Sequence, residues 1–278
     1  MNTAIPGLRG ASAESLADVR ERLYERLADG SVDPATVAGE LFEFVRLLDN
    51  EHALRRALSD PAYDGDRKAR LADSLLGEQF SEATRDLVGR LVRARWARAS
   101  HLGDAAETLA VLAEVTRAER DGHLHDLEDE LFRFRRIVDG QPQLRAVLSD
   151  PAAPAQHKRG LLEDLLGDKA RPATLRLATE VATYPRGRGF DRGMQIYGQI
   201  AAQRRQRLIA VVRSAVVLDD EQRRRLADVL SDAYGQEVHL NIEIDPEVVG
   251  GLSVRIGDEL IDGTIVGRLA RTRRRLAR

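Results

Sequence analysis

The feature that most constrains this chain is an internal repeat with an offset of 90 residues. Between the windows 40–77 and 130–167, 18 of the 38 positions are identical without a gap. Both windows begin with Glu-Leu-Phe, and both contain Leu-Ser-Asp-Pro-Ala, at Leu58–Ala62 and at Leu148–Ala152. Unrelated segments of this length share far fewer residues, so this region is a duplication of one structural unit.

Each copy has the pattern of a series of short helices. Apolar residues return every three or four positions from Val37 to Leu48, which is typical of an amphipathic helix. Pro61 and Pro151 are expected to end the helices before them, because the residue that precedes proline is displaced from helical geometry. Gly77 and Gly167 are expected to end a later helix in each copy as left-handed caps.

Two helical bundles therefore follow from the duplication, residues 1–104 and residues 105–207. Ser81 is expected to cap the helix that begins at Glu82. Aromatic residues make up only 4% of the chain, so the cores must consist mainly of Leu, Val, Ala and Ile. Leu and Ala are also strong helix formers.

The period changes near Arg207. A β-branched run begins at Leu208, Asp219 or Asp220 is expected to cap a helix, and strict alternation from Val238 to Ile244 predicts a half-buried strand. A further strand and a last helix from Thr264 complete the order β-α-β-β-α, a three-stranded sheet covered by two helices. The predicted fold class is thus mainly α, with a duplicated N-terminal helical bundle followed by a small α/β domain at 208–278.

Sequence patterns of catalysis and cofactor binding are missing. Neither common glycine-rich phosphate loop occurs, and the absence of Cys excludes thiolate nucleophiles and thiolate metal sites. His123 and His125 lie two positions apart, on different faces of a helix. The pair Gly250-Gly251 falls between strands, where a bulge or a close backbone approach is favoured over a ligand site. We predict no catalytic residue, no cofactor and no metal.

The charge balance argues against a nucleic-acid partner. Charged residues make up 32% of the chain, but the net charge is only -2. The C-terminal end is rich in arginine, with Arg268, Arg271, Arg273, Arg274, Arg275 and Arg278. These residues could contact phosphate or an acidic protein surface. The interpretation that their cations complement the dipole of a last helix is favoured. If this end does bind a partner, a protein is favoured over nucleic acid. Residues 206–278 hold 12 Arg and 12 Asp plus Glu, so this part of the chain is not basic as a whole. No apolar run reaches the roughly 18 residues that span a bilayer, so no direct membrane insertion is expected.

Short motifs spaced through the C-terminal segment carry a resemblance to a known family. They are Val238–Asn241, Ile244–Pro246, Gly250-Gly251, Ile256–Asp258, Ile261–Thr264 and Gly267–Leu269. Together they resemble the delta subunit of F-type ATP synthase, the family of the oligomycin-sensitivity-conferring protein. The helical region is also similar to the family's N-terminal six-helix bundle, but it occurs twice. The sequence thus resembles a longer bacterial form with an extra bundle copy.

That resemblance implies a non-catalytic stator subunit, present once per complex on the cytoplasmic face of the cell membrane. In the family, the helical domain grips the N-terminal extensions of the alpha subunits, and the C-terminal domain holds the peripheral-stalk b subunits. This connection couples proton translocation to ATP synthesis. The family-motif positions of the C-terminal domain are Gly250, Gly251, Gly257, Asp258, Ile261, Asp262, Gly263 and Arg268.

The second copy adjoins the C-terminal domain, as the single bundle does in the ordinary family arrangement, so we expect it to grip alpha. Its candidate partner-helix groove consists of Leu131, Phe132, Phe134, Leu161 and Leu165. The principal alternative is a helical scaffold or regulatory protein of another complex, which would show no affinity for ATP synthase subunits. A nucleic-acid-binding protein, another alternative, would show steeply salt-dependent binding.

Overall fold

The computed structural model describes residues 8–28, 30–205, 208–234, 238–245, 248, 250–256 and 259–262. The chain divides into two compact units, one extending to Arg205 and the other beginning at Gln206. The helices of the first unit are α1 (Ala11–Ala28), α2 (Pro34–Asn50), α3 (His52–Ser59), α4 (Gly65–Leu76), α5 (Glu82–Arg93), α6 (Ala99–Arg120), α7 (Leu124–Asp139), α8 (Pro142–Ser149), α9 (Ala155–Leu166), α10 (Pro172–Thr183) and α11 (Phe190–Arg205), with a 3-10 turn at Gly77–Gln79.

The duplication is reproduced helix by helix. Adding 90 to the bounds of α3, α4 and α5 gives the bounds of α8, α9 and α10. Tertiary contacts repeat as well. The carboxylate of Glu40 accepts the backbone N–H of Ser81 at 2.9 Å, and that of Glu130 accepts the backbone N–H of Arg171 at 2.9 Å. The predicted duplicated helical region is confirmed.

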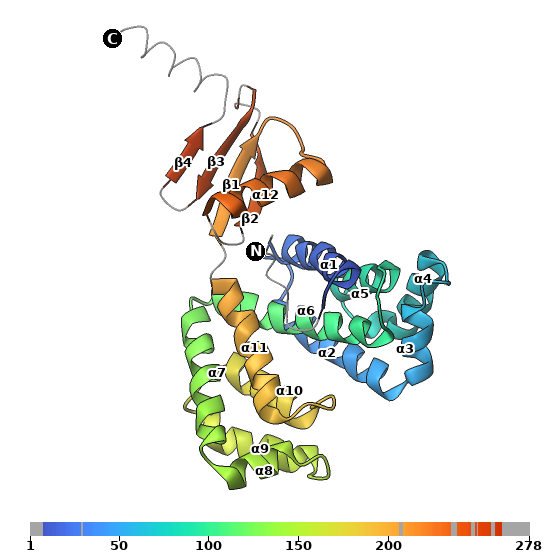
Figure 1. Ribbon diagram of the computed structural model, residues 1–278, viewed down its shortest axis with the longest axis vertical. Coiled ribbons are helices and arrows are strands. Elements are labelled where there is room, and N and C mark those ends of the chain that lie inside the picture. The colour runs from blue at the N-terminus through green and yellow to red at the C-terminus, as the bar shows by residue number, and fades with distance from the viewer. Residues whose placement is uncertain are drawn as a thin grey trace. The chain divides into compact units, whose positions relative to one another are not determined.

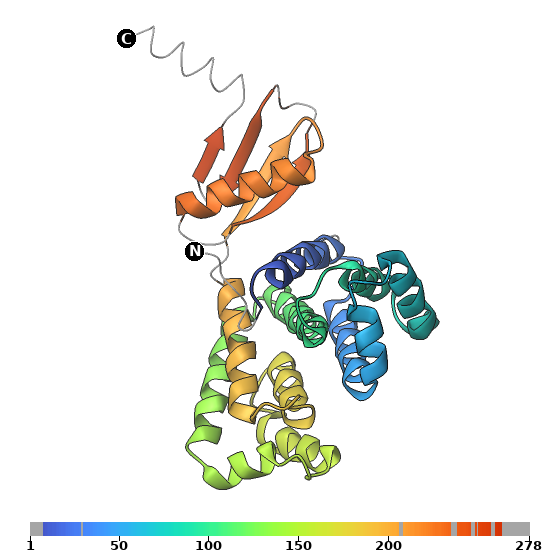
Figure 2. The same ribbon diagram turned by 45° about the vertical axis from the view of Figure 1, so that its right-hand side comes forward.

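Helix α6 belongs to both copies. Shifted by 90 residues, α1 and α11 both fall on α6, which is therefore the last helix of the first copy and the first helix of the second. Every residue from Ala105 to Thr116 is buried, so α6 has no solvent-facing side along this stretch. Figures 1 and 2 show helices of both copies around it. The predicted boundary between residues 104 and 105 falls inside this helix.

Helix ends in the two copies differ in one respect from the prediction. Ser81 caps α5, its hydroxyl accepting the N–H of Thr84 at 3.3 Å, and Gly77 has the expected positive φ of 59°. Gly167, however, has a φ of -48° and is not a left-handed cap. Its N–H continues the helical pattern to the carbonyl of Glu163 at 2.8 Å. A Cβ at this position would lie 2.7 Å from that oxygen, so a close approach accounts for the glycine.

Two arginines of α1 bind one carboxylate of α5. Nε of Arg22 lies 2.7 Å and Nε of Arg26 lies 3.0 Å from Oδ2 of Asp86. Burial alone would raise the pKa of Asp86, but the hydrogen bonds and positive charges of the two arginines outweigh it and lower this pKa. The carboxylate therefore stabilises the contact between α1 and α5 while it is ionised.

Replacing Asp86 with Asn should reduce the free energy of unfolding by about 1–2 kcal/mol at pH 7, because the partly buried arginines lose their anion. A lowered folded-state pKa gives stability that is present above the unfolded pKa, near 3.9, and is lost as the pH falls through the folded pKa. The difference between wild type and variant in urea unfolding should therefore shrink below about pH 4. The exposed Asp18→Asn serves as control; an equal loss there, or a pH-independent difference, would contradict the assignment.

The second unit is a small mixed domain, as predicted. Its elements are β1 (Leu208–Ser214), α12 (Asp220–Tyr234), β2 (Val238–Ile244), β3 (Leu252–Ile256) and β4 (Glu259–Asp262). The sheet order is β2-β1-β3-β4, with β1 parallel to β2 and antiparallel to β3. Figure 1 shows α12 against one face of this sheet. Asp219 caps α12 reciprocally: its carboxylate accepts the N–H of Gln222, whose side chain accepts the N–H of Asp219.

The sheet differs from the prediction in having four strands instead of three. Residues Glu259–Asp262, for which no strand was predicted, pair with β3 as a fourth strand. Alternation in β2 holds at Val238, which is buried, but Ile244 at the end of the strand is 57% exposed. The predicted last helix from Thr264 lies outside the described residues.

Candidate partner-binding groove

A groove of about 440 Å³ runs between α7 and α11 in the second copy. Leu131 of α7 and Met194 of α11 form its floor, and each is only 1% exposed. Phe132 stands at its edge with 51% of its surface exposed. A large aromatic side chain this exposed marks a candidate contact surface.

Two small residues of α11 keep the groove open. Gly198 and Ala202 lie four positions apart, and therefore on one face of the helix. A Cβ built on Gly198 would meet no heavy atom within 4 Å. A partner side chain or backbone can therefore approach α11 closely here.

The polar edge of the groove is held by an ion pair between its two helices. Nη1 of Arg135 on α7 lies 3.1 Å from Oδ1 of Asp191 on α11. The same guanidinium lies 6.0 Å from the ring centroid of Phe132. Arg135 thus limits the positions that the exposed ring can take.

The predicted groove residues do not all come together. Leu131 and Phe132 line the groove, whereas Phe134 is 5% exposed and packs edge-on against Phe190 at 6.0 Å between ring centroids. Leu161 and Leu165, on α9, are partly buried against the main core instead of lining the groove. The α11 half was missed, although the small residues Gly198 and Ala202 at helical spacing were a signal for it.

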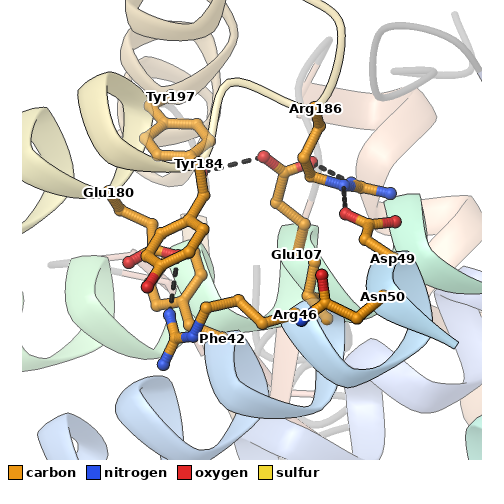
Figure 3. Close-up of a pocket in the computed structure, with 10 residues that line it drawn as sticks. Phe42, Arg46, Asp49, Asn50, Glu107, Glu180, Tyr184, Arg186 and Tyr197 are labelled. Carbon is orange, nitrogen blue, oxygen red and sulfur yellow. Dashed lines mark hydrogen bonds and ion pairs between the residues drawn. The ribbon is translucent and has the colours of Figure 1, made fainter. Parts of the chain in front are cut away.

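A buried polar cluster joins the two copies next to α6 (Figure 3). At its centre, the Glu107 carboxylate accepts hydrogen bonds from Arg186 at 2.5 Å, from the Tyr197 hydroxyl at 2.8 Å and from Arg188. Arg186 also binds Asp49 of the first copy through Nε at 2.7 Å. The cluster therefore links α2, α6, α11 and the loop after α10.

The electrostatics of this cluster keep Arg186 charged and Tyr197 protonated. Burial opposes the charged form of Arg186, but the negative charges of Glu107 and Asp49 outweigh it and raise the arginine's pKa. Burial, together with Glu107, raises the pKa of Tyr197, so its hydroxyl stays protonated and donates. Arg186 keeps a positive φ of 51°, a strained conformation that these contacts hold.

The shape and composition of this cluster argue against a ligand site. The cavity beside it measures about 50 Å³, whereas ligand pockets usually enclose about 300 Å³ or more.

Among the residues that the structure describes, no group of three or more His, Asp and Glu could hold a metal ion. Nor does any described helix have the length and hydropathy needed to cross a membrane.

The family-motif positions of the C-terminal unit are described only in part. Gly250 and Gly251 follow β2 with φ values of 64° and 94°, conformations that favour glycine. Ile261, 40% exposed, and Asp262 lie on β4. Gly257, Asp258, Gly263 and Arg268 lie outside the described residues.

Comparison with known proteins gives concordant matches. The sequence model of the family described as "ATP synthase delta (OSCP) subunit" matches twice, over residues 26–119 and 112–276. "ATP synthase subunit delta" of Thermobifida fusca is 51% identical over 97% of this chain and 100% of its own length. The protein of the same name from Streptomyces griseus is 48% identical over 97% and 100% of the two chains. The chain therefore belongs to the ATP synthase delta (OSCP) subunit family, whose members are non-catalytic stator subunits of that enzyme.

Proposed function

We propose that this chain connects the catalytic head of the ATP synthase to its peripheral stalk. The helical unit binds the N-terminal extensions of the alpha subunits, and the C-terminal unit binds the b subunits. One copy serves each complex, at the cytoplasmic face of the cell membrane. Holding the head against rotation lets proton translocation drive ATP synthesis.

The observation that best supports this proposal is a helical unit with one continuous core and an open groove that has an apolar floor and a polar rim. Helix α6 and the Glu107 cluster join the two copies, so force applied to one copy passes to the other through packed side chains. The groove between α7 and α11 is suited to receive an amphipathic helix from a partner. It lies in the second copy, which we propose grips alpha.

Calorimetric titration with two partners tests both ends of the connection. A peptide of the alpha N-terminal extension from the same organism should bind the full chain saturably and at moderate salt. A chain truncated after Arg205, which retains the helical core, should bind this peptide with the same affinity and lose binding to the b subunits. Undiminished b binding by the truncated chain would contradict the assignment of the ends. Failure of the peptide to bind the full chain would contradict the alpha contact.

A further inference from the structure

One surface of the repeat is buried in the first copy and partly exposed in the second. In the first copy, helices α2 and α6 form a face that is almost entirely buried. On α6, Ala105, Thr108, Leu109 and Leu112 are at most 6% exposed. Phe42 of α2 is 7% exposed, and its ring centroid lies 6.4 Å from that of Tyr197 in the second copy. The second copy therefore covers this face of the first.

The equivalent face of the second copy, 90 residues later, is the groove between α7 and α11. On α11, the equivalents of the buried α6 residues are Gln195, Gly198, Gln199 and Ala202, and none of them is buried. Phe132 is the equivalent of Phe42, and it is 51% exposed instead of 7%. The groove is thus the uncovered counterpart of a surface that is covered elsewhere in the same chain.

The repeat itself explains the difference. The face of α2 and α6 is covered because α6 is followed by another bundle that packs upon it. Helix α11 occupies the place of α6 in the second copy, but no further bundle follows it in the described part of the chain; the next elements belong to the mixed unit. In the described part of the chain, this face of the second copy therefore has no cover equivalent to the one that the first copy has.

We propose that the groove between α7 and α11 binds one amphipathic helix of another subunit of the complex. The filled counterpart specifies its chemistry. The helix places an aromatic or long aliphatic side chain against Phe132, as Tyr197 lies against Phe42. Its backbone approaches α11 at Gly198 and Ala202, and polar residues beside its apolar stripe meet Gln195 and Gln199 at the rim.

This inference rests on the proposed function only in taking the helix from the ATP synthase complex. The docking surface itself follows from comparing the two copies. Binding of the alpha peptide and occupation of the groove can therefore be measured separately.

The chain has no cysteine, so a single one can be introduced as a reporter. Gly198→Cys places a thiol in the groove, and Gly160→Cys places one on the exposed surface of α9. Both glycines are helical, and a Cβ at either meets no heavy atom within 4 Å, so both variants should fold. Alkylation by a maleimide is measured on the isolated full-length variant and on the assembled ATP synthase.

We expect the thiol of Gly198→Cys to react readily in the isolated protein and at least about tenfold more slowly in the complex, as burial in an interface requires. The thiol of Gly160→Cys should change its rate less than about twofold. Equal reactivity of the Gly198→Cys thiol in both states would overturn the proposal, as would protection already present in the isolated chain. A photo-crosslinker attached to this thiol should join an amphipathic helical segment of another subunit; a crosslink to a polar, non-helical segment would also overturn it.

A groove-filling variant separates this proposal from the alpha contact. Gly198→Trp should weaken assembly of the chain into the complex at least about tenfold, and Gly160→Trp should not. If the alpha peptide fails to bind but the Gly198→Cys thiol is protected in the complex, the groove proposal stands and the alpha contact falls. If the peptide binds Gly198→Trp normally and the Gly198→Cys thiol is unprotected, the groove proposal falls and the alpha contact stands.

Discussion

Replacing Leu109 with Asp should reduce the free energy of unfolding of the helical unit by at least about 4 kcal/mol, enough to unfold much of the population at 37 °C. Leu109 lies in α6 with no exposed surface, and the helix around it is buried on every side. A carboxylate there must either ionise without water or take up a proton. Because both copies share α6, we expect both to unfold together.

Urea unfolding followed by two signals measures this effect. Fluorescence of Trp96, the only tryptophan, reports on the first copy. Circular dichroism at 222 nm is measured on the chain truncated after Arg205, so that it reports on the helices of both copies without α12. The two transitions of wild type should coincide, and both should move together in the variant. The control is Gln199→Asp, at the equivalent position of α11, which is exposed and should change stability by less than about 0.5 kcal/mol. Separate transitions, or equal losses in the two variants, would contradict a shared α6.

Replacing Glu107 with Ala should cost about 3–5 kcal/mol, because it leaves Arg186 and Arg188 without their central anion in a buried site. The Glu107 side chain is 7% exposed and that of Arg186 is 10% exposed. Asp49 and Asp104 still contact Arg186 in this variant, so we expect the lower end of this range. Because both copies share one core, the loss should lower the stability of the whole helical unit in one transition.

Two variants bracket this result in the same urea experiment. Tyr197→Phe removes only the hydroxyl that donates to Glu107 and should cost about 1 kcal/mol. Glu43→Ala removes an exposed carboxylate of α2 and should be nearly neutral. A loss for Glu107→Ala no larger than that for Glu43→Ala would show that the cluster contributes nothing to joining the copies.

The helices were predictable from the sequence because each end has a local cause. Pro61, Pro151 and the Ser81 cap act within a few residues. Because the sequence repeats, the helix ends predicted in one copy could also be predicted at the equivalent positions of the other. Gly167 is an exception. It is the equivalent of Gly77 in the repeat, but its φ is negative instead of positive. The close carbonyl of Glu163, and not a left-handed backbone, accounts for the glycine there. Strand β4 was missed as a strand since four residues are too few for a period to be recognised.

The shared helix and the groove depend on contacts between distant segments, which periodicity does not report. Glu107 is one of several charged residues in α6, and its partners Arg186, Arg188 and Tyr197 lie 79, 81 and 90 residues later in the chain. Leu161 has the helical spacing of a groove residue, but the same spacing also places a residue in a core. Burial on all sides of Ala105–Thr116 identifies α6 as a helix shared by the two copies, although Glu107 and Glu114 lie within this segment.

A bridging measurement tests most directly whether this chain connects head to stalk. The stalk segment of b is immobilised, and a fluorescent peptide of the alpha N-terminal extension is passed over it with the full chain, with the chain truncated after Arg205, or alone. We predict that the peptide is retained only when the full chain is present. We also predict that each immobilised stalk segment captures one full chain with bound peptide. Retention with the truncated chain, or none with the full chain, would contradict the proposed connection.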